Sequence, residues 1–315
     1  MGLQQIFENK KYLLFIFILS FIIRVLFYYF FIKDSSVIWD FDSRVYKQVA
    51  EQIIGNKKII NCDGSSHFYR VPGYSIFLAL TNFENNFNNS ILIQIVLSSF
   101  IPILIFYLCL ILFPQDLFVA KLVALVSSFN IGLTIFSGLA MSESIFLILF
   151  LLFLIYFLKN KIFYSGVFLG LASMFRPVGH YIIFISIFLI LFLHKKFYKK
   201  LKFIFYILSG WFFIVLPWLF RNYLLTGCLF FTTLPGIHFI KHSAARIYMQ
   251  ANNISYISAL NKVDIDWQDA IKINSQKNNK FLNEAEISNL GEKIAFGYFV
   301  KYPFISLNLS LKKYL

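Results

Sequence analysis

Apolar and polar segments alternate along the first two thirds of the chain. Seven apolar runs lie at residues 12–32, 90–113, 117–137, 143–158, 162–175, 178–194 and 203–221. A helix of about 20 apolar residues crosses the hydrocarbon core of a bilayer and satisfies its own backbone hydrogen bonds there. Three of the runs are shorter than a full crossing, which implies tilting or local thinning. The pattern predicts an all-α polytopic membrane protein with about seven transmembrane helices.

Composition supports this fold class. Of the 315 residues, 59% are hydrophobic and only 14% are charged. A soluble domain of this size could not bury so much apolar surface. The run at 12–32 is too long and too aromatic for a signal peptide, and no small-residue cleavage site follows it, so we expect it to be a retained first span.

Basic residues are concentrated in alternate connections. They are Lys10, Lys11, Lys121, Lys159, Lys161, Lys195, Lys196, Lys199, Lys200 and Lys202. The positive-inside rule makes these connections cytoplasmic. It therefore places residues 34–74, 137–143 and 176–177, and everything after Arg221, on the outer face of the cell (inner or plasma) membrane. The same rule and anionic lipid account for the net charge of +14, so we expect no nucleic-acid partner.

The segment 34–74 is the first long polar connection in the chain, and it carries four aspartates and five basic residues. Within it, Ser43–Ile54 has the spacing of an amphipathic helix, and Gly55 is a natural C-terminal stop. A second short apolar run, Gly73–Leu80, follows a proline. We expect both to be interfacial helices lying at the membrane surface.

The predicted organisation is a transmembrane core at residues 1–225 and an outer-face polar segment at residues 226–315. Residues 222–283 are mixed and polar, without a clear period. Residues 284–302 are predicted to be helical, and residues 303–309 resemble the start of a further apolar span.

Three acids outside the apolar cores of the spans are candidates for chemistry. Asp42 precedes the first predicted interfacial helix, so it is either the N-cap of that helix or a general base at the membrane surface. Asp40 is either a solvated loop acid or the alternative base. Glu143 begins the fourth span, where it either complements the helix dipole or orients substrate and arginines.

Three arginines lie beside prolines or aromatic residues at predicted outer span ends: Arg70, Arg176 and Arg221. Snorkelling to headgroups explains any one of them. Because positive charge is disfavoured on the outer side, three together suggest binding of an anionic group such as a lipid phosphate. Arg24 lies inside the first span, where a structural partner within the bundle is expected.

The histidines and cysteines do not have the spacing of a metal site, and none is assigned. Cys62 and Cys228 both lie in polar segments on the predicted outer side, so a disulfide between them is possible.

Five short segments occur in order between residues 42 and 227. They are Asp42-Ser43-x-x-Tyr46 with Ala50 and Gly55, Tyr69-Arg70-x-Pro72-Gly73-Tyr74, Ser142-Glu143-Ser144, Gly166-x-x-x-Gly170-Leu171-Ala172 with Arg176-Pro177, and Pro217-Trp218-x-x-Arg221-Asn222 with Gly227. Together they resemble the integral-membrane GT-C glycosyltransferases that use polyprenyl-phosphate sugars. The closest branch is the protein-mannosyltransferase and lipid A aminoarabinose-transferase group.

This resemblance implies a GT-C helical bundle whose first outer loop holds the catalytic base, at Asp42 or, failing that, at Asp40. The implied reaction is inverting transfer of a sugar from a polyprenyl-phosphate donor to a protein, lipid A or another glycan on the outer face. The donor phosphate would be bound by Arg70, Arg176 and Arg221, with Tyr46, Tyr74 and Glu143 also in the substrate site. No cofactor is implied, and a role for a divalent cation stays open.

Members of this family usually continue for several more spans, whereas the given sequence ends at Leu315. The resemblance therefore leads us to expect a truncated frame, half of a split enzyme, or a short member. Two other functions stay open from the residues. One is a transporter or flippase for a lipid-linked sugar, and the other is a non-catalytic remnant or assembly partner.

Overall fold

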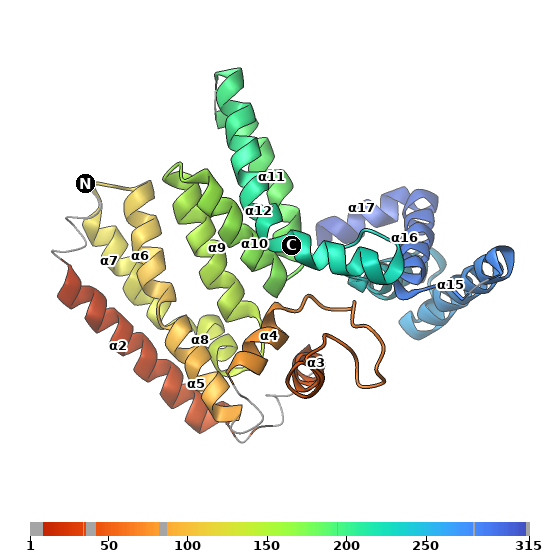
Figure 1. The fold of residues 1–315 in the computed structure, drawn as a ribbon, viewed down its shortest axis with the longest axis horizontal. Coiled ribbons are helices and arrows are strands. Elements are labelled where there is room, and N and C mark those ends of the chain that lie inside the picture. The colour runs from red at the N-terminus through yellow and green to blue at the C-terminus, as the bar shows by residue number, and fades with distance from the viewer. Residues whose placement is uncertain are drawn as a thin grey trace. The chain divides into compact units, whose positions relative to one another are not determined.

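The computed structural model describes residues 9–33, 35, 42–81, 87–193, 195–279 and 281–312, and within them the regular elements are helices (Figure 1). The first part of the chain contains α2 (Lys10–Phe27), the π-helical turn η1 (Tyr28–Ile32), α3 (Asp42–Asn56), α4 (Gly73–Leu80), α5 (Phe87–Ser98), α6 (Ile101–Leu112), α7 (Leu117–Ser128), α8 (Ile131–Gly138), α9 (Glu143–Leu158), α10 (Ile162–Phe175), α11 (Val178–Leu193) and α12 (Phe197–Thr226). The last part contains α13 (Leu234–His238), η3 (Phe239–Ala244), α14 (Ala245–Asn252), α15 (Tyr256–Asn278), α16 (Glu284–Lys301) and α17 (Pro303–Lys312). The prediction of an all-helical protein is confirmed for the described residues.

Among the described residues, three helices are long and apolar enough to cross a membrane: Lys10–Ile32, Asn88–Leu112 and Phe197–Thr226. A fourth crossing results if α7 and α8 form one span, although they are bent by 49°. The bend lies at Asn130, whose side chain accepts a hydrogen bond from the Leu133 amide at 3.0 Å and so starts a new helix. The remaining apolar helices, α9, α10 and α11, are 10–17 residues long.

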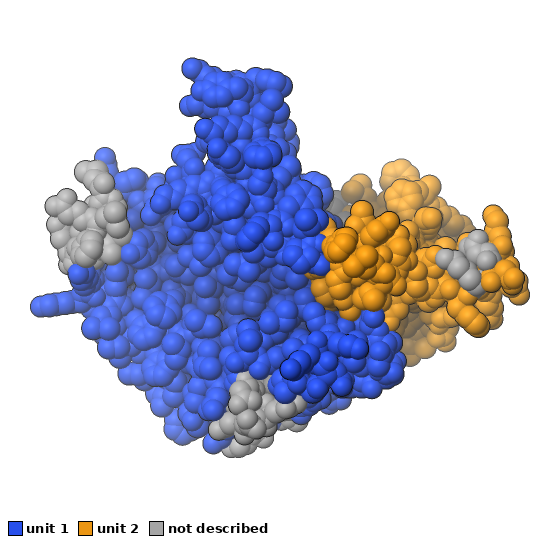
Figure 2. Space-filling model, in the orientation of Figure 1, with its two compact units in different colours: residues 1–67, 71–217 blue, residues 68–70, 218–315 orange. Residues whose placement is uncertain are grey.

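The chain divides into two compact units (Figure 2). Unit 1 comprises residues 1–67 and 71–217, and unit 2 comprises residues 68–70 and 218–315. The boundary after unit 1 falls at Pro217, which lies inside α12. A proline there removes one backbone donor from the helix.

In unit 1, α9 and α10 form an antiparallel hairpin, and α12 packs directly on α10. The hairpin turns at Asn160, which has the left-handed φ of +57°. A Cβ at Gly166 would overlap the carbonyl oxygen of Ile207, and a Cβ at Gly210 would overlap that of Phe163. Two glycines, one from each helix, therefore bring the α10 and α12 backbones into contact, as small residues do in membrane helix pairs.

The two helices expected in the first polar loop are present in unit 1. α4 has the predicted bounds, whereas α3 begins at Asp42 and continues to Asn56. The prediction that Gly55 ends α3 was wrong, because Gly55 lies within the helix and Lys57 adopts the left-handed φ of +54°. Lys57 takes the terminating conformation that glycine usually supplies.

Arg24 is fully buried in α2, within a candidate span. Its Nη1 donates to the carbonyl and hydroxyl oxygens of Ser20, one turn earlier. The structural partner expected for this arginine is therefore within its own helix.

Unit 2 contains the helices from α13 to α17, with a core of five buried residues: Ile240, Ala244, Val263, Trp267 and Ala295. The Trp267 indole donates to the Ile287 carbonyl at 3.1 Å, which ties α15 to α16. Residues 222–283, which lack an obvious period, are mostly helical. The signal was present but narrow, because the buried residues Ala259, Val263 and Trp267 follow one another at four-residue intervals.

Candidate functional site

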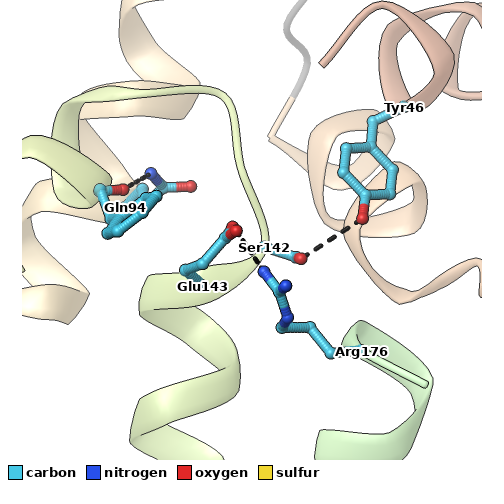
Figure 3. Close-up of polar contacts among 6 residues, drawn as sticks. Tyr46, Gln94, Ser142, Glu143 and Arg176 are labelled. Carbon is cyan, nitrogen blue, oxygen red and sulfur yellow. Dashed lines mark hydrogen bonds and ion pairs between the residues drawn. The ribbon is translucent and has the colours of Figure 1, made fainter. Parts of the chain in front are cut away.

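The site in unit 1 begins with an ion pair between Glu143 and Arg176, in which Glu143 Oε1 contacts Arg176 Nη1 (Figure 3). Glu143 is the first residue of α9, and Arg176 follows the last residue of α10. The two helices have 16 and 14 residues and are antiparallel. Similar lengths and a short turn place the start of one beside the end of the other.

Tyr46 reaches the same place from α3. Its hydroxyl lies 3.3 Å from the Ser142 hydroxyl, which immediately precedes Glu143 (Figure 3). The Tyr46 ring packs edge-on against Tyr74, with ring centroids 5.0 Å apart. Two residues predicted to be in the substrate site, Tyr46 and Tyr74, are therefore in contact with each other and adjacent to a third, Glu143.

Tyr74 continues the polar network inward to Gln94, a residue that the sequence reasoning missed. The Tyr74 hydroxyl donates to Gln94 Oε1 at 2.7 Å. The Gln94 amide donates to the carbonyls of Phe136, Ser137 and Leu139 at 3.2, 3.0 and 2.7 Å. The signal available in the sequence was a lone amide in an apolar run. Gln94 is fully buried in the structure, and a buried polar group requires partners.

Burial also affects the chemistry of Tyr74. Burial, followed by the nearby Tyr46 and Glu143, raises the pKa of the Tyr74 phenol well above its ordinary value. Tyr74 is therefore a neutral hydrogen-bond donor under physiological conditions and does not act as a base.

Gly73 explains why α4 lies so close to the ion pair. A Cβ at Gly73 would overlap the carbonyl of Met174, near the end of α10. The Pro72-Gly73-Tyr74 sequence thus combines a proline at the helix start, a glycine that permits backbone contact with α10, and a buried tyrosine. Met174 is two residues before Arg176, so this contact supports the segment that carries the arginine.

Asp42 lies in the first turn of α3, one residue further into the helix than predicted, and its side chain is half-buried. Four residues separate it from Tyr46, so the two side chains share one face of the helix. A carboxylate in a first turn also complements the helix dipole. Asp40, the alternative base, lies outside the described residues.

Arg70 and Arg221 belong to unit 2, where Arg70 ends the segment 68–70 and Arg221 lies beside it. The Arg221 guanidinium lies 4.8 Å from the centroids of the Phe68 and Trp218 rings, and Arg70 lies 5.2 Å from the Tyr69 ring. Both are cation–π contacts, and Arg221 Nη1 also donates to Asn222 Oδ1 at 2.9 Å.

The segment 68–70 is itself held by the chain that follows α12. Thr232 donates to the Tyr69 carbonyl at 2.5 Å, and the Thr233 amide donates to the Phe68 carbonyl at 3.0 Å. The Phe68 and Phe230 rings pack 5.4 Å apart. The structure thus brings Arg70 and Arg221 to one short segment although they are far apart in the sequence.

The predicted site residues therefore fall into two groups. Asp42, Tyr46, Tyr74, Glu143 and Arg176 lie in unit 1, and Arg70 and Arg221 lie in unit 2. Cys62, Cys109 and Cys228 are free thiols in the structure. Cys62 lies in unit 1 and Cys228 in unit 2, so a disulfide between them stays a prediction. Among the described residues, no three His, Cys, Asp or Glu side chains gather in a way that could hold a metal ion.

Chemically, the unit 1 group combines a half-buried carboxylate at a helix start with hydroxyls and a guanidinium that is already paired. Glu143 Oε2 is buried without a hydrogen-bond partner among the described residues. A buried acceptor of this kind is costly and can accept a donor from a bound molecule. Comparisons with known protein families, with characterised proteins and with solved structures yield no match for this chain.

Proposed function

We propose that this chain is a membrane glycosyltransferase that takes a sugar from a polyprenyl-phosphate donor on the outer face of the membrane. One observation carries the proposal: Tyr46, one helical turn after Asp42, reaches the Ser142–Glu143 helix start that is paired with Arg176. A carboxylate and a cation are thereby carried by neighbouring elements in one unit. Those are the two charges that inverting transfer from a phosphate requires.

The proposed topology has seven crossings, with α9, α10 and α11 as short spans in a locally thinned bilayer. It is supported by large apolar side chains exposed on these helices and on α12, as a lipid-facing surface requires. Examples are Phe184, Phe188, Phe192 and Phe213, whose exposures are 61%, 57%, 72% and 72%. It is also supported by the alternation of basic connections in the sequence.

In the proposed reaction, Asp42 takes the proton of an acceptor hydroxyl or amine. The acceptor atom then bonds to the anomeric carbon of the sugar, and the bond from that carbon to the phosphate oxygen breaks. The electron pair leaves with the polyprenyl phosphate, whose charge Arg176 stabilises. The phosphate role of Arg70 and Arg221, which lie in unit 2, stays a prediction. A phosphate ester is a good leaving group, so the reaction needs a base for the acceptor more than an acid for the donor.

Glu143 has a positioning role in this scheme. Its ion pair holds Arg176 at the end of α10, and its second carboxylate oxygen is available to a donor on the substrate. Tyr46 and Tyr74 are buried against each other between α3 and α4, so in this scheme they support the helices that border the substrate site.

The test uses the full chain in lipid nanodiscs with a radiolabelled polyprenyl-phosphate sugar, scored as label transferred to acceptor and as free polyprenyl phosphate. Asp42→Asn is expected to lower turnover by at least about a hundredfold, because general-base catalysis contributes that much or more. The matched control is Asp63→Asn. Asp63 lies in the same polar loop but is exposed and accepts hydrogen bonds only from Ser65 among the described residues.

Equal turnover of wild type and Asp42→Asn would remove Asp42 from the role of base. Movement of the donor across the bilayer of sealed vesicles, without release of polyprenyl phosphate, would replace the transferase with a lipid-linked-sugar transporter.

A further inference from the structure

Unit 2 contains a polar cavity that the proposed reaction does not use. Its volume is about 230 Å³. One wall is the chain after α12, and the other is the start of α16. The lining residues are Cys228, Leu229, Phe230, Thr232, Thr233, Ala285, Glu286, Ser288, Asn289 and Glu292.

The α16 wall is one face of a helix, because Ala285, Ser288, Asn289 and Glu292 recur at three- and four-residue intervals. A capping box holds the start of this helix in place. The Glu286 backbone N–H donates to Asn283 Oδ1 at 3.0 Å, and the Asn283 backbone N–H donates to Glu286 Oε2 at 2.9 Å. Ser288 donates to the Thr233 carbonyl at 2.9 Å. The two walls are therefore joined by a hydrogen bond between lining residues.

The opposite wall is also held in position. The Thr232 hydroxyl donates a hydrogen bond to the Tyr69 carbonyl, and Phe230 packs against Phe68. Phe230 thus presents a fixed apolar ring beside polar groups of α16. An apolar surface with a few convergent polar groups is typical of a small-molecule site.

The charge of the cavity restricts its ligand. No lysine or arginine lines it, whereas the carboxylates of Glu286 and Glu292 do. Partial burial raises the pKa of the Glu292 carboxyl. Carboxylates accept hydrogen bonds from hydroxyl and ammonium groups and repel anions. A phosphate or an acidic sugar is therefore disfavoured.

A second cavity, of about 150 Å³, extends the polar surface. It is lined by Asn274, Leu282, Glu286, Asn289, Leu290 and Lys293. Glu286 and Asn289 line both cavities, so a ligand longer than one ring can continue across the start of α16.

We propose that the larger cavity binds a hydroxyl-rich sugar ring without an anionic group, with Asn289, Glu286 and Glu292 hydrogen-bonding to its polar groups and Phe230 lying against its apolar face. Assigning this sugar to the acceptor rests on the transferase proposed above. Under that assignment, the acceptor of the transferase is a glycan or glycolipid and not a bare polypeptide. The exclusion of an anionic ring follows from the cavity alone.

The test measures binding to the full chain in nanodiscs, without donor, by saturation-transfer difference NMR. The probes are methyl glucoside, glucosamine and glucose 6-phosphate, which present a neutral, a cationic and an anionic group on one ring type. We expect the first two to bind and glucose 6-phosphate to bind at least tenfold more weakly. Equal binding of all three probes would overturn the proposal.

Variants locate the binding. Asn289→Ala is expected to weaken methyl glucoside binding at least fivefold, and Glu292→Lys is expected to raise the relative affinity for glucose 6-phosphate at least tenfold. Asn289 and Glu292 are exposed, so both variants should fold. Asp269→Asn is the control, because Asp269 is an exposed acid on α15 that lines neither cavity. Unchanged binding in Asn289→Ala and Glu292→Lys would move the sugar elsewhere.

The two proposals fail in different ways. Sugar binding that responds to these variants, in a chain that never releases polyprenyl phosphate, would leave the cavity assigned and reject the transferase. Turnover on a glycan acceptor that is unaffected by Asn289→Ala would leave the transferase and reject the cavity as its acceptor site.

Discussion

At the scale of single residues, Gln94 links three segments through one fully buried amide. It accepts from Tyr74 on α4 and donates to three carbonyls at and beyond the end of α8. Those carbonyls belong to a helix end that needs partners. Removing the amide would leave the Tyr74 hydroxyl and at least one carbonyl without a partner in an apolar interior.

Replacing Gln94 with Leu should therefore destabilise the protein by about 2 kcal/mol, since each buried donor or acceptor without a hydrogen-bond partner costs about 1–3 kcal/mol. For a chain of this size that lowers the midpoint of thermal unfolding by roughly 3 °C. Gln48→Leu, at an exposed position of α3, is the control and should shift the midpoint by much less. Equal midpoints for the two variants in detergent would contradict the bridging role of Gln94.

The Glu143–Arg176 pair makes a second prediction at this scale. Both side chains are partly exposed, at 22% and 35%, so breaking the pair should cost stability only modestly, by about 1 kcal/mol. Glu143→Gln should nevertheless lower sugar transfer at least tenfold, because Arg176 loses its position. The exchanged double variant Glu143→Arg with Arg176→Glu should recover thermal stability but not transfer. Recovery of both would assign the pair a structural role alone.

At the scale of elements, the α10–α12 contact depends on glycines that face the partner backbone. Gly166 lies against Ile207, and Gly210 lies against Phe163. A larger side chain at either position must separate the helices, and loosening α10 would displace Arg176 at its end.

Gly210→Leu should therefore lower the free energy of unfolding by about 2 kcal/mol or more, since overpacking a well-packed interface typically costs 1–3 kcal/mol. The yield of folded protein and the thermal midpoint should fall with it. Gly55→Ala is the contrasting variant. Gly55 is inside α3 with open space around its Cα, so alanine there should stabilise by about 0.5–1 kcal/mol. Size-exclusion profiles and thermal unfolding in detergent give the comparison, and tolerance of Gly210→Leu would contradict the close contact.

At the scale of the whole molecule, the number of crossings decides which connections share a face of the membrane. Three helices are long enough to cross, or four with the bent pair, and α9, α10 and α11 are short. The seven-span proposal requires the loop that contains Cys62 and the turn that contains Asn160 to lie on opposite sides. Fewer crossings can place them on the same side.

Cysteine labelling tests this topology. Cys62 is exposed, so in a variant with Cys109 and Cys228 replaced by Ser it should react with a membrane-impermeant maleimide added to intact cells. A variant with Asn160→Cys as its one cysteine should react only after permeabilisation. Labelling of both from outside would contradict the seven-span arrangement.

The sequence by itself determined where the helices lie. Apolar length and period are local properties, so α4, α9 and α10 have the predicted bounds, and the other predicted runs are also helical. The sequence predicted helix ends and breaks less well. Examples are the end of α3, which is at Asn56 and not at Gly55, and the break between α7 and α8. Residues 222–283 were hard to interpret because a narrow four-residue stripe is weaker than a broad apolar face.

Only the tertiary structure decided which polar groups meet. Glu143 contacts Arg176 because two helices of similar length fold back on each other, and Gln94 bridges Tyr74 and α8 because α5 lies between them. Arg221 contacts Phe68, two residues before Arg70, because Thr232 and Thr233 hydrogen-bond to the segment 68–70. These contacts join residues that are distant in the chain, and no local propensity encodes a distance between them. Packing of the apolar surfaces sets those distances, and the polar contacts follow from it.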